Sequence, residues 1–186
     1  CMRIVKIALI PFTLLLASTI QAGPISFSGQ FDPALATVQT NGGNGSVSFL
    51  GAPVSITITG SDSWSNNYIR TLVFWSITTP VTDLSFDWEY NTSDVWGPSW
   101  DPAGYCIDAS CIQLSNSSGS NSQSGSVAGI NLIAGQTFGF YVDTVEDDFG
   151  PAHLTITGAE VPEPATAGLV LVPLALLAGM KLRRKA

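Results

Sequence analysis

The sequence predicts an all-β fold for the central part of the chain, an antiparallel β-sandwich of the jelly-roll type. Three observations support this prediction. Apolar and polar residues alternate in several short runs, Gly, Asn, Ser and Pro separate the runs, and residues 24–158 show no helical period. Such alternation places an apolar row on one face of a strand and a polar row on the other, as in antiparallel sheets with one solvated face.

The strands are expected in a regular series along the chain. The clearest alternation has the apolar rows Val54-Ile56-Ile58, Leu84-Phe86-Trp88-Tyr90 and Leu154-Ile156. Short apolar runs bounded by turn residues predict further strands at 25–31, 45–50, 68–77, 104–107, 111–114, 127–133 and 137–143. Loops are expected at 92–104, which prolines interrupt, and at 115–125, which holds only Ser, Asn, Gly and Gln. Roughly nine or ten short strands without a helix are typical of a sandwich or jelly roll.

The N-terminal end has the pattern of a secretory signal peptide. Arg3 and Lys6 form a short basic region, residues 7–20 form an apolar run, and Ala22 is a small residue at the expected cleavage point. This order predicts export through the secretion translocon and removal of residues 1–22 by signal peptidase.

The C-terminal end predicts a transmembrane helix followed by a basic tail. Residues 165–180 carry no charge, and as a helix they would span about 24 Å of a hydrocarbon core ~30 Å thick. The long basic side chains that follow can extend to the membrane surface and supply the missing length. They also hold this end in the cytoplasm and leave the preceding domain outside. These basic residues are Lys181, Arg183, Arg184 and Lys185.

A short motif lies directly before this helix. The run Val161-Pro162-Glu163-Pro164-Ala165-Thr166, the apolar stretch and Arg183-Arg184 together resemble the PEP-CTERM sorting signal, over residues 161–186. The resemblance implies an export substrate of a Gram-negative bacterium that is transiently anchored in the inner membrane. An exosortase-type transpeptidase would recognise Pro162-Glu163-Pro164 and release the protein to the cell surface or extracellular matrix. The alternative is a proline-rich linker before a plain anchor.

The extracytoplasmic domain, residues 23–160, is strongly acidic. It contains thirteen Asp and Glu residues and one basic residue, Arg70, for a formal net charge of −12. Such a domain repels phosphate backbones and anionic headgroups. The charge therefore excludes nucleic acid as a partner.

Two cysteines are expected to form a disulfide. Cys106 and Cys111 flank a short hairpin, and a two-residue turn at Asp108-Ala109 would place them opposite each other, with their Cα atoms about 4.5 Å apart. Export to an oxidising compartment favours the bond. The alternative, a pair of thiolate metal ligands, lacks companion ligands, because His153 is the one histidine of the chain.

The sequence does not predict an enzyme. A Ser-His-Asp site would need His153, which we expect to point outward from a strand, and no glycine-flanked nucleophile motif occurs. Asp87 and Glu89 share a strand face, where a solvated pair is the simpler interpretation of two such carboxylates than a glycosidase pair. No cofactor is expected. Residues 143–148 offer carboxylates for calcium, but they are read as a solvated acidic loop, since their spacing matches no calcium-binding loop.

Trp96 and Trp100 are the candidate glycan contacts. Aromatic rings beside carboxylates can stack on sugars, but we expect these two tryptophans to cap one end of the core instead. The leading hypothesis is therefore a non-catalytic surface or extracellular-matrix protein associated with exopolysaccharide or biofilm. A carbohydrate-binding module is the alternative, and a glycoside or ester hydrolase is third.

The sorting signal generates the first testable prediction. In its native host the chain should be cleaved near Pro162-Glu163-Pro164, because two prolines hold this segment extended and accessible to a protease. Mass spectrometry of the surface form should find no peptide from residues 181–186. An intact C-terminus on the surface form would contradict the prediction.

Overall fold

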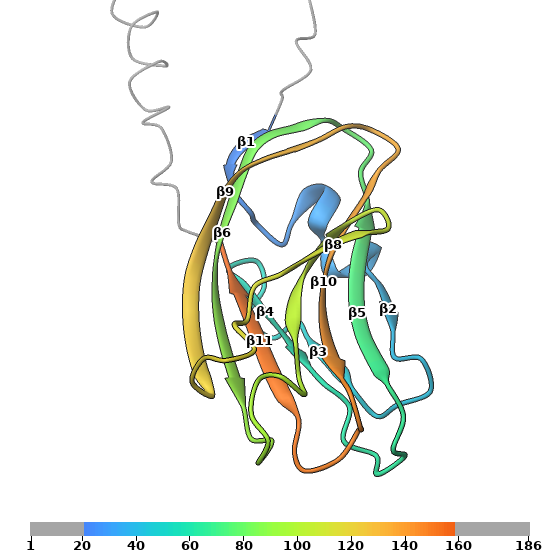
Figure 1. Cartoon of the computed structure of the whole chain (residues 1–186). Coiled ribbons are helices and arrows are strands. Elements are labelled where there is room, and N and C mark those ends of the chain that lie inside the picture. Colours follow the sequence, from blue (N-terminus) through green and yellow to red (C-terminus); the bar gives the residue numbers. More distant parts are fainter. Residues whose placement is uncertain (1–20, 159–186) are drawn as a thin grey trace, which may run out of the picture.

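The computed structural model describes residues 21–158, which form two β-sheets packed face to face (Figure 1). The first sheet has the strand order β1-β6-β11-β4-β3, with β9 also paired to β6, and the second has the order β2-β5-β10-β7-β8. The strands are β1 (Gln21–Pro24), β2 (Thr37–Gln39), β3 (Ser46–Ser48), β4 (Ser55–Thr59), β5 (Ile69–Ser76), β6 (Val81–Thr92), β7 (Ala103–Ile107), β8 (Ser110–Gln113), β9 (Ser122–Leu132), β10 (Thr137–Thr144) and β11 (Ala152–Thr157).

This arrangement confirms the predicted all-β sandwich. Strand pairing is antiparallel throughout the described residues, except that β1 runs parallel to the start of β6. The sorting signal at 161–186 and all of the predicted signal peptide except Gln21 and Ala22 lie outside these residues. No helix within residues 21–158 is long and apolar enough to cross a membrane.

Aromatic rings from both sheets fill the space between them. Phe86 of the first sheet meets Phe140 of the second edge to face, with ring centroids 5.1 Å apart. Trp75 is wholly buried and its indole N–H donates to the backbone carbonyl of Asp32 at 2.9 Å, so the polar end of this large side chain is satisfied inside the core. The alternation of β6 holds as predicted: Leu84, Phe86 and Tyr90 are buried and Trp88 is half-buried against the same core.

The predicted strand at 25–31 is wrong. Ile25, Phe27 and Phe31 are buried as an apolar run should be. However, Gly29 takes a positive φ of 59°, and the chain turns there into two short 3₁₀ helices, Gly29–Phe31 and Pro33–Leu35. Neither β1 nor β2 was predicted. β2 is fully exposed and therefore has no buried apolar row that the sequence pattern could indicate.

The predicted loop at 115–125 ends earlier than expected, because β9 begins at Ser122. Its first residues pair with β6 through their backbones, with Gly125 opposite Trp88. A Cβ atom at Gly125 would lie 2.9 Å from the Trp88 ring, so the missing side chain makes room for the indole. A strand of small polar residues has no hydrophobic pattern, and its edge position and this ring contact are tertiary features.

The hairpin of β7 and β8 confirms the predicted disulfide. Cys106 pairs with Cys111 across the strands and Ile107 with Ser110, so the turn is Asp108-Ala109 as expected. The two sulfur atoms are bonded and the Cα atoms are 4.0 Å apart. Asp108 takes a positive φ of 53°, which is a conformation that Asp tolerates better than most residues.

Replacing Cys106 and Cys111 together by Ser should lower the free energy of unfolding by roughly 2 kcal/mol, since so short a loop removes little entropy from the unfolded chain. Denaturant unfolding of the variant beside the wild type measures this difference. Protein isolated from the periplasm or the medium should react with thiol reagents only after reduction. Free thiols before reduction would contradict the assignment.

Candidate functional site

Three loops meet at one end of the sandwich, which we call the loop end: the β4–β5 loop (60–68), the β6–β7 loop (93–102) and the β10–β11 loop (145–151). Figure 1 shows them at the lower end of the molecule, whereas β1 lies at the upper end. Backbone hydrogen bonds join the loops. The Trp64 N–H donates to Asp147, that of Val145 to Trp100 and that of Ser93 to Pro151. The loop end is therefore one connected surface.

Asp147 organises the β4–β5 loop. Its carboxylate accepts hydrogen bonds from the backbone N–H of Ser63 and from the hydroxyls of Ser63 and Ser65, the latter at 2.5 Å. Burial alone would raise the pKa of Asp147, but hydrogen bonds from Ser61, Ser63 and Ser65 hold this pKa below its ordinary value. A buried charge that neutral donors satisfy in this way fixes the loop around it.

Trp64 and Phe149 form an exposed aromatic pair at the loop end. Their ring centroids are 5.8 Å apart, and the two residues are 68% and 41% exposed. Both take positive φ angles, 58° for Trp64 and 65° for Phe149, which is unusual and strained for bulky residues. Core packing does not explain the strain, because the rings face solvent. Strained, exposed residues held in place by surrounding structure are typical of binding sites.

This pair was not among the candidate residues that the sequence indicated. The available signal was a tryptophan within Asp62-Ser63-Trp64-Ser65-Asn66, a segment too polar to be buried. The pairing itself could not be foreseen, because Trp64 and Phe149 come from loops that are far apart in the sequence.

The expectation that Trp96 and Trp100 cap the core is wrong for Trp96. Its side chain is 62% exposed, and its backbone N–H donates to the Asp94 carboxylate at 2.6 Å in a tight turn. Trp100 is half-buried and contributes the carbonyl that receives the Val145 N–H. Trp96 thus adds a third exposed aromatic ring to the loop end, and Trp100 helps to join two of its loops.

The segment 143–148 is not the uniform solvated loop that the sequence suggested. Asp143, Asp147 and Asp148 are all buried. Asp143 belongs to β10 and forms an ion pair with Arg70, its partner in register on β5. Neither Asp143 nor Asp147 is free to bind a cation, since Asp143 is held by a guanidinium and Asp147 by serines.

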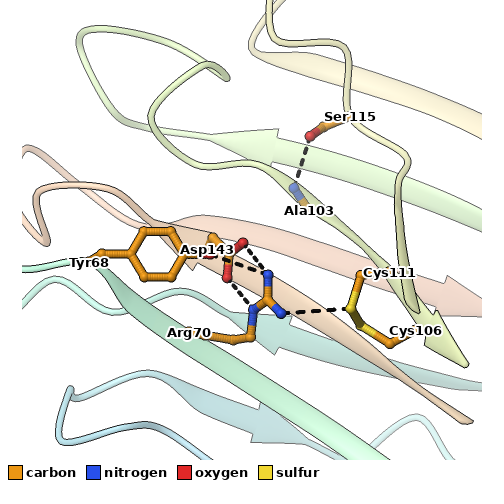
Figure 2. Close-up of polar contacts among 7 residues, drawn as sticks. All are labelled: Tyr68, Arg70, Ala103, Cys106, Cys111, Ser115 and Asp143. Atoms are coloured by element: carbon orange, nitrogen blue, oxygen red, sulfur yellow. Dashed lines mark hydrogen bonds and ion pairs between the residues drawn. A yellow bond between two sulfur atoms is a disulfide. The ribbon is translucent and has the colours of Figure 1, made fainter. Parts of the chain in front are cut away.

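Figure 2 shows the surroundings of Arg70, on the outer face of the second sheet. Its Nε and Nη2 donate to the two Asp143 oxygens at 2.6 and 2.7 Å, and its guanidinium lies 4.3 Å from the centre of the Tyr141 ring. Nη1 also reaches the Cys111 sulfur at 3.7 Å. Burial and the Asp143 carboxylate raise the pKa of the neighbouring Tyr68 hydroxyl to about 12. This bidentate, stacked geometry ties β5 to β10.

Two grooves lie on the outer faces of the sheets. One, of about 370 Å³, is bordered by Arg70, Leu72, Phe74 and the disulfide. The other, of about 420 Å³, crosses the first sheet and is lined by Glu89, Asn91, Ser122, Ser124, His153 and Thr155. It is polar, and the adjoining Tyr90 ring is buried in the core. It therefore offers hydrogen bonds but no exposed aromatic face for stacking.

His153 points outward from β11, as predicted, and its Nδ1 lies 3.0 Å from the Thr59 hydroxyl. A catalytic triad would require a carboxylate on one side of the imidazole and a nucleophile on the other. Asp87, on the same face, instead accepts a hydrogen bond from Ser126 at 2.6 Å. The geometry of these residues gives no catalytic arrangement.

Two further buried carboxylates lie in the β6–β7 loop. Asp101 is wholly buried, and one of its oxygens accepts the Thr92 hydroxyl at 2.5 Å. Burial, with the negative charges of Asp94 and Asp62, raises the pKa of Asp101 to about 7. Burial also raises the pKa of Asp94, and the charges of Asp148 and Asp62 add to the effect. These acids repel one another, in contrast to Asp143 and Asp147.

Comparison with known proteins places the chain in no family: no family model and no curated protein matches it. Among solved structures it is similar to the Podospora anserina GH26-CBM35 β-(1,4)-mannanase, with 16% identity and a TM-score of 0.29 over 70% of this chain. It is also similar to Streptomyces albus HEPD, solved with 2-hydroxyethylphosphonate and Fe(II) bound, with 11% identity and a TM-score of 0.16 over 67% of this chain. The match covers 26% of each of those chains, and such low scores carry no argument about function.

The raised pKa of Asp101 predicts how stability depends on pH. Because the folded protein holds this proton up to about pH 7 and the ordinary value is 3.8, the unfolded state loses it first, and Asp101 destabilises the fold increasingly as the pH rises between those values. Asp101→Asn removes the titration. In metal-free buffer the variant should match the wild type near pH 4 and exceed it by roughly 4 kcal/mol at pH 8.

Denaturant unfolding over this pH range measures the difference. Asp83→Asn is the control, because Asp83 is exposed and lies near the other end of β6, in a positive-φ conformation that Asn tolerates. A difference between Asp101→Asn and the wild type that stays constant with pH would contradict the assignment.

Proposed function

We propose that this chain is a non-catalytic exported protein of the cell surface or extracellular matrix, and that its β-sandwich associates with extracellular polysaccharide through the loop end. The sorting half of the proposal rests on the motif Pro162-Glu163-Pro164, the apolar stretch and Arg183-Arg184. Its partners would be the secretion translocon, signal peptidase and an exosortase-type transpeptidase of a Gram-negative bacterium.

The observation that carries the binding half is the strained, exposed pair Trp64 and Phe149. Aromatic faces match the C–H faces of sugar rings, and stacking on them suits ligands that are neutral or only weakly charged. Trp96 supplies another exposed ring at the same end. The acidic character of the domain disfavours strongly anionic polysaccharides, so we assign it a neutral glycan.

The orientation of the domain agrees with this role. β1 lies toward the upper end of the sandwich in Figure 1, and Gly158, which follows β11, packs against the Ile25 carbonyl just after β1. Both ends of the described chain thus lie away from the three loops. A tether that continues from Gly158 would leave the loop end facing outward.

The exposed tryptophan provides the test. Trp64→Ala should abolish retention on insoluble neutral polysaccharide, while the free energy of unfolding changes by less than about 1 kcal/mol, since the ring is exposed and the variant opens no cavity in the core. Phe149→Ala should behave in the same way. Leu50→Ala is the matched control, because Leu50 is 98% exposed and lies in the β3–β4 turn, away from the loop end.

Polysaccharide pull-down and thermal unfolding of the same samples make the comparison. Unchanged retention in both aromatic variants would refute glycan binding at the loop end. Turnover of glycosides or esters by the wild type would favour the hydrolase alternative over a non-catalytic role.

A further inference from the structure

Four carboxylates lie in the loops that also carry the exposed aromatic rings, and within residues 21–158 no cation balances them. Asp94, Asp101 and Asp148 are 3%, 0% and 7% exposed, and Asp62 is half-buried. They come from all three loops. Arg70, the single Lys or Arg within residues 21–158, is already engaged by Asp143. Burial of like charges without a counterion is strongly unfavourable.

Two of these carboxylates also have unsatisfied oxygens. Oδ1 of Asp101 and Oδ1 of Asp62 are both buried, and neither has a hydrogen-bond partner. Buried polar atoms in folded proteins are almost always satisfied, and an exception calls for an unseen water or ion. A cation would displace the proton of Asp101 and could bind both oxygen atoms, whereas a water would satisfy them only in part.

Hydrogen bonds link Asp94 to Asp101 and hold the backbone at Asp62. The Thr92 hydroxyl donates to Asp101 at 2.5 Å and accepts the Asp94 backbone N–H at 3.0 Å, so it links the two acids directly. Asn44 holds the backbone at Asp62, since its side chain accepts from the backbone N–H and donates to the backbone carbonyl of Asp62 at 2.7 and 2.9 Å.

We propose that Asp62, Asp94, Asp101 and Asp148 form a calcium site that joins the three loops. Calcium takes six to eight oxygen ligands in flexible geometry and accepts backbone carbonyls and waters beside carboxylates. Zinc is disfavoured, because the ligand set holds neither histidine nor cysteine. Magnesium is disfavoured, because it demands a compact octahedral set.

The site must tighten when the ion binds. Within residues 21–158 no three His, Cys, Asp or Glu side chains already converge as a metal cluster. The ion therefore draws the carboxylates together, and with them the loops that carry Trp64, Trp96 and Phe149. This site goes beyond glycan binding and does not require it, since the ion would bind whether or not a sugar is present.

The test uses the full-length chain in a mild detergent, stripped of metal by a chelator and titrated with calcium chloride. Calorimetry should give one calcium ion per chain, and saturating calcium should raise the unfolding midpoint by several degrees. Amides of the three loops should become protected from hydrogen exchange. Asp101→Asn and Asp94→Asn should each weaken calcium affinity at least tenfold, whereas Asp83→Asn should not change it.

Metal-free stability separates lost binding from misfolding. Without calcium, Asp101→Asn should be at least as stable as the wild type, because it removes one of the repelling charges. Failure of the wild type to bind calcium at millimolar concentration would overturn the proposal, as would equal affinities in all three variants or tighter binding of magnesium. No sugar is present in these experiments, so their outcome is independent of the polysaccharide pull-down.

Discussion

The contact between Phe86 and Phe140 is the interaction on which the sandwich depends. The two rings come from opposite sheets and meet edge to face in the centre of the core, and Phe138 and Tyr105 extend the same aromatic cluster. On β6 most residues between the buried ones are exposed, whereas β10 and β7 are buried along nearly all of their length. The cluster lies between the two sheets and so determines which face of each sheet points inward. The packing of these two inward faces determines which strand ends lie together, and three loops meet at one of these ends.

The buried carboxylates have three kinds of surroundings. Asp143 receives the guanidinium of Arg70, and Asp147 is surrounded by hydroxyl and amide donors. Asp101 has one hydroxyl donor and otherwise faces other acids. The first two arrangements stabilise the ionised form and lock strands and loops in place. The third leaves acidic groups without a basic partner, and Asp101 belongs to the same loop as the exposed Trp96.

The loops of the loop end must be held rigid by polar interactions. Exposed aromatic residues in strained conformations need a rigid support, and the loops that carry them bury few apolar side chains to provide one. Hydrogen bonds around Asp147 supply part of that support. A cation shared by the remaining acids would supply the rest, and it would join loops that the sequence keeps apart.

The sequence by itself determined the all-β class, most of the strand positions and the disulfide. The reason is that both signals are local: apolar alternation specifies the buried face of a strand, and the close spacing of two cysteines places them opposite each other in a hairpin. It could not determine β2 or the start of β9, which lack apolar rows and exist through backbone pairing with neighbours. It also could not place Trp64 against Phe149 or Asp62 near Asp101. Those pairs are decided by the packing of the two sheets, which alone brings the ends of distant strands together.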